Sequence, residues 1–336
     1  MRIAVDAMGG DHAPREIVKG AVHAARDLPG VSRIILVGDQ RAIERELSAQ
    51  GECPASIEIR HASEVVGMGE APAQAIRRKK DSSVSRAIDL VKAHEVDAAL
   101  SAGNTGALVV AATLKLRTLA GVDRPALAAV MPTIKRPFVL IDAGANPDCE
   151  AKLLLQFAVM GSVYAKIILG QEKPVVGLMG IGAEDSKGNE TTREAFGLLR
   201  AAPLNFRGNV EGHDLFHGDT DVVVCDGFAG NVVLKTAEAT ARAIGHWMRQ
   251  EFTAGVTQKL GALLLRQALR RMKAKMDPET YGGAPLLGVN GICIKTHGSS
   301  SSKAIFHGIR VASESAHRHL NRQIEELVAQ AAGVSA

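Results

Sequence analysis

The sequence predicts an α/β protein built around a mainly parallel β-sheet. Short runs rich in isoleucine, valine and leucine alternate with longer segments of helical periodicity, which is typical of strand–helix–strand units. The hydrophobic fraction of 46% and the charged fraction of 23% are those of a globular protein, and 34 glycines in 336 residues give turns unusual weight. The chain has no internal repeat and no low-complexity linker, so we expect one α/β domain over residues 1–336.

Seven strands are predicted, and a polar, glycine-rich turn follows each of them. They span residues 2–6, 33–37, 97–100, 138–141, 175–179, 221–225 and 291–295. Because parallel strands end at the same edge of a sheet, we expect all of these turns to line one crevice.

The longer segments carry the signals of helix ends. Pro14 fits the first turn of a helix over residues 14–27, where its missing N–H costs nothing. Asn104 or Thr105 can cap a helix that reaches about residue 119. The other predicted helices span residues 84–94, 151–169, 231–251 and 302–332. Ser82 or Ser83 can cap the first of these, and the helix over 151–169 is apolar almost all round, so we expect it at the centre of the protein.

Four of the turns have a composition suited to binding an anion. Small residues let backbone N–H groups approach the anion, and the helix that follows points its positive end at the same place. One such turn is ordinary strand-end structure, but four at one edge indicate a phosphate site. Its candidate residues are Gly9, Gly10, Asp11, Ser101, Gly103, Asn104, Thr105, Gly106, Gly227, Asn231, Gly298, Ser299 and Ser300.

Several familiar motifs are missing, and their absence excludes classes of enzyme. There is no G-x-x-x-x-G-K-[ST] loop, and the first strand leads into Met8-Gly9-Gly10-Asp11 instead of G-x-G-x-x-G, so neither a nucleotide triphosphatase nor a standard dinucleotide enzyme is supported. There is also no G-x-S-x-G elbow and no H-E-x-x-H helix. An acyl transfer at this site would therefore need no nucleophile from the protein.

Composition also limits partners and location. Aromatic residues are 3% of the chain and the net charge is +4, so nucleic acid is not an expected partner. The four cysteines, Cys53, Cys149, Cys225 and Cys293, form no C-x-x-C pair and are read as reduced thiols. With no signal-peptide pattern and no apolar run near the ~18–20 residues of a membrane span, we expect a cytoplasmic protein that can still attach to a membrane surface.

In their order along the chain, the turns resemble those of the phosphate acyltransferases of bacterial phospholipid synthesis, the acyl-ACP:phosphate transacylases or PlsX family. The similar motifs cover nearly the whole chain, at residues 6–11, 61–64, 78–83, 101–106, 142–146, 187–190, 225–231 with Lys235, 281–288 and 297–300. Through these motifs Asn146 and Asn189 join the expected phosphate and substrate contacts. One departure is Ala229, which stands where the family loop reads D-G-F-T-G-N.

The resemblance implies a reaction in which acyl-ACP (acyl carrier protein) and inorganic phosphate give acyl phosphate. The product would feed a membrane-bound glycerol-3-phosphate acyltransferase. It also implies a Rossmann-like three-layer α/β/α fold, related to isopropylmalate dehydrogenases and phosphotransacetylases, in a homodimer without a metal or redox cofactor. Two alternatives stay open: a phosphotransacetylase-like or dehydrogenase-like enzyme on a small substrate, and a non-catalytic acyl-carrier or membrane scaffold.

This chemistry gives three candidate catalytic residues, Asn104, Lys235 and His297, with Ser299 as a phosphate contact. We expect Asn104 and Ser299, with the amides of their loops, to hold phosphate, and Lys235 and His297 to neutralise the oxyanion or protonate the departing thiolate. The alternative is that His297 caps its strand end and Lys235 is a surface charge. For Asp142 and Asp226 a turn-bracing role is favoured.

A basic amphipathic stretch lies at about residues 255–280, and we expect it to protrude as a helix. Between Lys259 and Lys275 it has six basic residues and no acidic one, with apolar side chains on one stripe. Such a helix can lie on a membrane or hold the acidic carrier protein, and the alternative is a dimer-packing helix. The expected contact residues are Leu265, Arg266, Leu269, Arg270, Met272 and Lys273.

Overall fold

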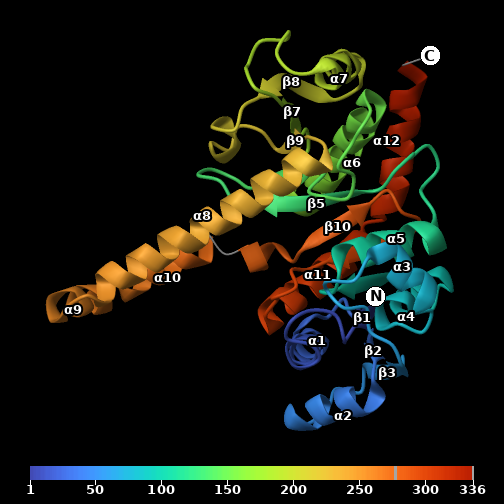
Figure 1. Ribbon diagram of the computed structural model, residues 1–336, viewed down its shortest axis with the longest axis vertical. Helices are drawn as coiled ribbons and strands as arrows, with labels where there is room; N and C mark the ends of the chain where they lie inside the picture. Colours follow the sequence, from blue (N-terminus) through green and yellow to red (C-terminus); the bar gives the residue numbers. More distant parts are fainter. Residues whose placement is uncertain (276–277, 335–336) are drawn as a thin grey trace.

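The structure, a computed structural model, describes residues 1–275 and 278–334, without the side chains of Lys273, Pro278 and residues 332–334. Its centre is one eleven-stranded sheet in the order β3-β2-β1-β4-β11-β10-β5-β6-β9-β7-β8 (Figure 1). The strands are β1 (Arg2–Asp6), β2 (Arg33–Gly38), β3 (Ile57–His61), β4 (Ala98–Ser101), β5 (Ala126–Met131), β6 (Phe138–Ile141), β7 (Val175–Met179), β8 (Asn205–Val210), β9 (Val222–Val224), β10 (Ala284–Leu287) and β11 (Ile292–Lys295). All seven predicted strands are present, within one or two residues at each end.

The sheet is mainly parallel, as predicted, but it contains two halves of opposite direction. Strands β3, β2, β1, β4 and β11 are parallel to one another, as are β6, β9, β7 and β8. The three antiparallel pairings, β11 with β10, β10 with β5, and β5 with β6, lie between the halves. An odd number of reversals makes the halves point opposite ways, so the expectation that all the turns line one edge was wrong.

The reversal has a local cause that sequence reasoning missed. Only residues 132–137 separate β5 from β6, and a connection that short joins antiparallel neighbours, because a parallel crossover needs a dozen or more residues. β5 was not predicted, since its sequence, Ala-Leu-Ala-Ala-Val-Met, has little of the β-branched character of a strand.

Helices cover both faces of the sheet, and this confirms the three-layer α/β/α prediction. Alternate strand residues point to opposite faces: Ile3 and Val5 belong to one core cluster with buried residues of α1, α6, α11 and α12, whereas Ala4 belongs to another with those of α3, α4 and α5. The helices are α1 (Arg15–Asp27), α2 (Gln40–Ala49), α3 (Pro72–Arg78), α4 (Ser83–Lys92), α5 (Thr105–Leu116), α6 (Ala151–Leu169), α7 (Glu190–Ala201), α8 (Gly227–Thr253), α9 (Val256–Leu264), α10 (Arg266–Lys275), α11 (Ser302–His317) and α12 (Leu320–Val334).

One helix prediction needs correction, and so does the expectation that no apolar run approaches the length of a membrane span. The single helix expected over 302–332 is divided into α11 and α12 at His319, whose φ of 53° is left-handed. By length and composition α6 could cross a membrane, although no segment of this kind was expected. However, 78% of its apolar stretch is buried inside the protein. It is therefore the central core helix that its apolar circumference predicted.

A helical arm extends from the body of the protein. Figure 1 shows α8 leaving the sheet, with α9 at its far end. Of the 27 residues of α8 only Gly227 and Gly230 are buried, and no residue of α9 is buried, although every residue of both helices is described. The basic stretch, expected as one helix, is divided at Leu265 between α9 and α10.

Candidate active site

Three of the four glycine-rich turns meet at the carboxyl edge of β1, β4 and β11, which are neighbours in the sheet. Backbone hydrogen bonds tie them together: the Asp11 N–H donates to the Gly298 carbonyl at 2.7 Å, and the Thr296 N–H donates to the Ser101 carbonyl at 3.0 Å. The turns at residues 9–11, 101–106 and 296–300 thus form one continuous polar surface. We call it the strand-end site.

Glycine is required where these turns touch. A Cβ on Gly9 would lie 2.7 Å from the Gly103 nitrogen, and a Cβ on Gly10 would lie 2.8 Å from the Gly298 carbonyl oxygen. Gly10 also has φ of +103°, which side chains rarely adopt. The close approach leaves room for backbone alone where the turns meet.

Asn104 begins α5, as predicted, and its side chain is committed to the fold. Its Oδ1 accepts the Ala107 N–H at 3.0 Å, and its Nδ2 donates to the carbonyls of Met68 at 3.0 Å and Glu70 at 3.1 Å. The expectation that this side chain itself holds phosphate therefore finds no support in the geometry. The N–H groups of Thr105 and Gly106 in the first turn of α5 have no partner within the helix and can serve an anion instead.

Hydroxyl groups line the third turn of the strand-end site. Ser300 is 3% exposed, and its Oγ has no hydrogen-bond partner among the described residues; the Thr296 hydroxyl is in the same state. Leaving such a group unpaired costs about 1–3 kcal/mol, so a ligand oxygen here would relieve a real penalty. Ser299 is exposed, and its Oγ lies 2.8 Å from His297 Nδ1.

The structure places His297 and Lys235 near each other, with Glu238 of α8 between them. Glu238 lies 3.0 Å from the Lys235 ammonium and 3.9 Å from both His297 and Arg242. Burial and the Lys235 cation lower the pKa of His297, and its Nδ1 accepts the Ser299 N–H at 3.2 Å. His297 is therefore mainly neutral at pH 7 and orients the serine turn. Glu238 was missed, although its spacing from Lys235 and Arg242 on one helix is a usable signal.

Two further charged residues of the site were also missed. Asp6, at the end of β1, is 2% exposed and accepts a hydrogen bond from Ser101 Oγ at 2.6 Å. Lys295, at the end of β11, is 7% exposed, and burial lowers its pKa to about 8. The sequence could have identified both residues, because each is a charged residue at the last position of a strand that is otherwise largely apolar and buried.

The fourth turn belongs to a separate cluster at the opposite edge. There the Gly227 N–H donates to the Asn146 carbonyl at 2.7 Å, and Asn231 lies against Gly144. Because β6 and β9 run opposite to β4 and β11, Asn146, Gly227 and Asn231 lie at the other edge of the sheet. Lys235, one helical turn beyond Asn231, is the residue of α8 that reaches the strand-end site.

The carboxylates of this second cluster brace turns, as favoured from the sequence. Asp142 accepts the N–H groups of Leu127 at 2.9 Å and Asn146 at 2.7 Å, and Asp226 caps α8 by accepting the Ala229 N–H at 2.7 Å. Ala229 itself packs on a core cluster and makes no further polar contact among the described side chains. Asn189 caps α7 by accepting the Thr192 N–H at 2.9 Å, and it joins neither cluster.

Thiol chemistry finds little support. Burial raises the pKa of Cys149 to about 11 and that of Cys293 to about 12, and it raises the pKa of Cys225 well above its ordinary value. Cys53 is exposed in the segment before β3. Thiols with raised pKa values are poor nucleophiles at neutral pH. Within residues 1–275 and 278–334, no group of three or more His, Cys, Asp or Glu side chains could hold a metal ion.

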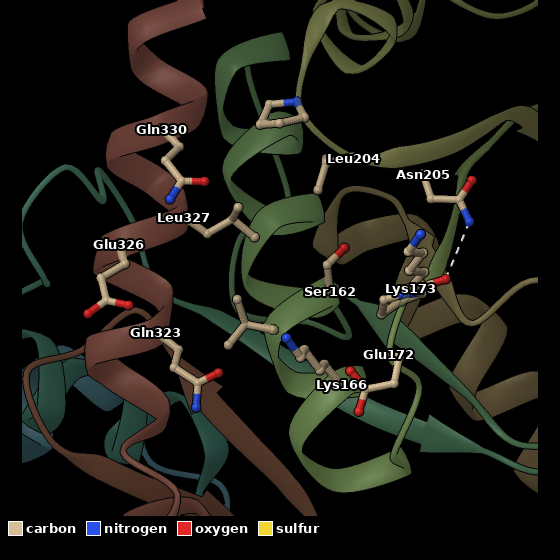
Figure 2. A pocket seen from close by; sticks show the side chains of 13 residues that line it. Ser162, Lys166, Glu172, Lys173, Leu204, Asn205, Gln323, Glu326, Leu327 and Gln330 are labelled. Carbon is tan, nitrogen blue, oxygen red and sulfur yellow. Dashed lines mark hydrogen bonds between the residues drawn. The ribbon is translucent and has the colours of Figure 1, made fainter.

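Two cavities bear on where a substrate sits. A cavity of about 380 Å³ adjoins the strand-end site and is lined by His12, Ala13, Arg15, Glu16, Ser299 and Ser301. A larger one of about 630 Å³ lies between α6, α12 and residues 203–205 (Figure 2). Pro174 and Asn205 place it at the amino ends of β7 and β8, whereas ligands of such sheets bind at carboxyl ends. The smaller cavity is therefore the better candidate for the substrate.

At the far end of the arm, four apolar side chains of α9 are exposed. Val256, Leu260, Leu263 and Leu264 are 84%, 60%, 63% and 80% exposed. Of the expected contact residues, Leu265 is 51% and Met272 38% exposed, Arg266 and Arg270 are exposed, and Leu269 is half-buried. The side chain of Lys273 lies outside the described ones. The apolar surface is thus displaced from the predicted stripe toward the tip.

Known proteins resemble this chain along nearly its whole length. Residues 1–323 match the family model described as fatty acid synthesis protein. A phosphate acyltransferase of Desulfitobacterium hafniense is 54% identical over 315 residues, 94% of this chain and 93% of the relative. Among solved structures, a phosphotransacetylase from Streptococcus pyogenes has a TM-score of 0.61 at 19% identity, covering 95% and 94% of the two chains. A 4-hydroxythreonine-4-phosphate dehydrogenase from Klebsiella pneumoniae has a TM-score of 0.52 at 16% identity, covering 96% and 99%. The two solved structures support the fold alone.

Proposed function

The chain belongs to the phosphate acyltransferase family, and from that premise we propose that it transfers a fatty acyl group from acyl carrier protein to inorganic phosphate. The product is an acyl phosphate for phospholipid synthesis, and the reaction is reversible. The observation that carries the proposal is the strand-end site, in which three turns of small residues meet beside Lys235 and Lys295.

The residues present fit the binding of phosphate. The Thr105 and Gly106 amides, the amide of Gly298 and the unpaired Ser300 hydroxyl offer donors from two sides. The Lys235 ammonium adds positive charge from α8. Fixing phosphate at near-attack distance from the thioester is the largest contribution such a site can make, about 7–11 kcal/mol in the best cases.

We propose direct attack by the bound phosphate, with no acyl-enzyme intermediate. Phosphate is anionic at neutral pH and a thiol leaving group has pKa about 8.5, so neither a strong base nor a protein nucleophile is required. The raised pKa values of the buried cysteines and the absence of a serine elbow support this order of events. Donors aimed at the thioester oxyanion contribute roughly 3–4 kcal/mol each, and Lys235 is our candidate for this role.

The arm supports a second part of the proposal, which concerns location. We propose that the protein is cytoplasmic and that α9 and α10 touch the inner face of the membrane, where the acyl phosphate meets a membrane-bound acyltransferase. The exposed apolar residues of α9 stand beside Arg266 and Arg270. Apolar and basic side chains together favour an anionic lipid surface.

We propose a homodimer in which α8 of one protomer packs on the partner subunit. Phe228, Val232 and Trp247 of α8 are 68%, 49% and 61% exposed. A long helix with so little of its apolar surface covered is typical of an interaction site.

The proposed reaction is tested by the choice of acyl donor. Purified protein is incubated with ³²P-labelled phosphate and either acyl-ACP, acyl-CoA or free fatty acid, and labelled acyl phosphate is extracted and counted. We expect product from acyl-ACP with equimolar release of carrier thiol. Faster turnover of acyl-CoA would instead indicate a phosphotransacetylase-like enzyme, and no product from any donor would indicate a scaffold.

A further inference from the structure

Three buried polar residues lie in a row across the carboxyl ends of three adjacent strands. Asp6 of β1 is in register with Ser101 of β4, and Ser101 is in register with Lys295 of β11. Residues in register on parallel strands project from the same face, so the three side chains are neighbours. Their exposed fractions are 2%, 2% and 7%.

The row is connected to the turns of the strand-end site. Ser101 Oγ donates to Asp6 at 2.6 Å and accepts the Gly103 N–H at 3.0 Å. The Lys295 ammonium donates to the carbonyl of Thr296 and, at 3.4 Å, to that of Ala102. Lys295 therefore lies between the second and third turns, where the reacting groups would be bound.

Lys295 is a buried cation without an ion pair. No carboxylate of the described residues lies within 4.0 Å of its ammonium group, and its two carbonyl acceptors leave one of its three N–H donors unused. Such a group is costly to bury, and the fold of a strand end does not require it. A cost of this kind beside candidate binding turns indicates a functional group.

We propose that Lys295 donates the proton that the departing thiolate of the acyl carrier takes up, an inference that rests on the function proposed above. A phosphate oxygen bonds to the thioester carbonyl carbon, the carbon–sulfur bond breaks with its electron pair on sulfur, and sulfur takes a proton from the Lys295 ammonium. The neutral amine regains a proton from solvent. In the reverse reaction the neutral amine accepts the proton of the carrier thiol.

The charges around Lys295 suit this exchange. Burial and the Lys235 cation of α8 lower the pKa of Lys295 to about 8, whereas the Asp6 and Asp11 carboxylates raise it. His297, of the turn that follows β11, also faces Lys295. A donor with pKa close to the 8.5 of a thiol can pass the proton in either direction. His297, with its pKa already lowered, is a weaker candidate for the donor at neutral pH.

The test combines two variants with a pH profile. Formation of acyl phosphate from acyl-ACP is measured between pH 6 and 10 for the wild type, Lys295→Met, Lys295→Arg and a control, Lys166→Met, which removes an exposed lysine of α6. The wild-type rate should fall as pH rises through about 8, because the ammonium form is needed. At pH 7 both Lys295 variants should lose about 100-fold or more of kcat and should lack that basic limb, since arginine keeps the charge but does not release its proton.

The alternatives give different results. An Lys295→Arg protein within about threefold of the wild type, or a basic limb unchanged in both variants, would show that Lys295 acts only through its charge or its packing, and the proposal falls. A wild-type rate that is flat to pH 10 overturns the proposal without any variant, which covers the case in which Lys295→Met does not fold. If the wild type forms no acyl phosphate at all, the proposed function itself fails, and this inference fails with it.

Discussion

At the scale of single residues, the strand-end site separates side chains that serve the fold from those left for chemistry. Asn104, Asp142 and Asp226 stood beside glycines in the sequence, and in the structure their oxygens accept backbone N–H groups of caps and turns. Lys295 and the Ser300 hydroxyl are buried beside the same turns, where Lys295 donates to two backbone carbonyls but has no ion pair among the described residues, and the Ser300 hydroxyl has no partner among them. Backbone-binding side chains can be foreseen from capping rules, whereas burial of a lysine depends on the register of distant strands.

Two substitutions of Asn104 distinguish capping from phosphate binding. Asn104→Ala removes the cap acceptor and the two donors to the 67–70 segment, whereas Asn104→Ser keeps a cap oxygen and loses only the donors. We expect Ala to lower the free energy of unfolding in urea by about 1 kcal/mol more than Ser. Both should speed amide exchange in residues 65–71.

The contrary outcome is specific. If the serine variant keeps wild-type amide exchange in that segment and yet needs more than about tenfold more phosphate, then the Asn104 side chain binds phosphate and its structural assignment is wrong.

At the scale of elements, predictions succeeded where a segment's own pattern decides its structure. α6 and β6 have the predicted bounds because β6 is wholly apolar, α6 is mainly apolar, and each is bounded by polar or glycine residues. β5 was missed because an alanine-rich run has no strong preference, and tertiary pairing decides it. The division of α11 from α12 at His319 left no proline or glycine signal in the sequence.

The arm is the element whose role can be tested alone. Leu264→Glu places a charge at the tip of the arm, at a position 80% exposed, and Ile181→Glu does the same at an 81% exposed position in the segment after β7. We expect Leu264→Glu to weaken co-sedimentation with anionic phosphatidylglycerol vesicles at least about tenfold and Ile181→Glu to leave it unchanged. High salt should weaken wild-type binding, because the basic residues of α10 contribute about 1 kcal/mol each.

Equal behaviour of the two variants would show that the tip is not the membrane contact. Binding that is unaffected by salt would exclude the basic face of α10 from it.

At the scale of the whole molecule, the antiparallel strands β10 and β5 divide the polar turns between two edges. The sequence identified which turns are polar, but direction follows from pairing between strands far apart in the chain, and β10 is inserted from near the C-terminus. α8 then links the clusters, since it starts at Gly227 in one and carries Lys235 to the other.

The oligomeric state can be read from the single tryptophan. Trp247 is the one tryptophan of the chain and is 61% exposed on α8. We expect dilution to dissociate the proposed homodimer, so that the mass measured by light scattering falls from two chains to one and the tryptophan emission shifts to longer wavelength. Ile244→Glu, one helical turn away, should move this dissociation to higher protein concentration. A mass of one chain at every concentration, or emission unchanged across the transition, would exclude α8 from the interface.

The central claim is that phosphate bound at the strand-end site attacks the thioester directly. Its most direct test is the intact mass of the protein after incubation with acyl-ACP in the absence of phosphate, followed by addition of ³²P-labelled phosphate. We expect no acylated protein before the addition and labelled acyl phosphate after it, in amounts equal to the carrier thiol released. A protein that gains the mass of the acyl group without phosphate, and then passes that group to phosphate when it is added, would contradict the account.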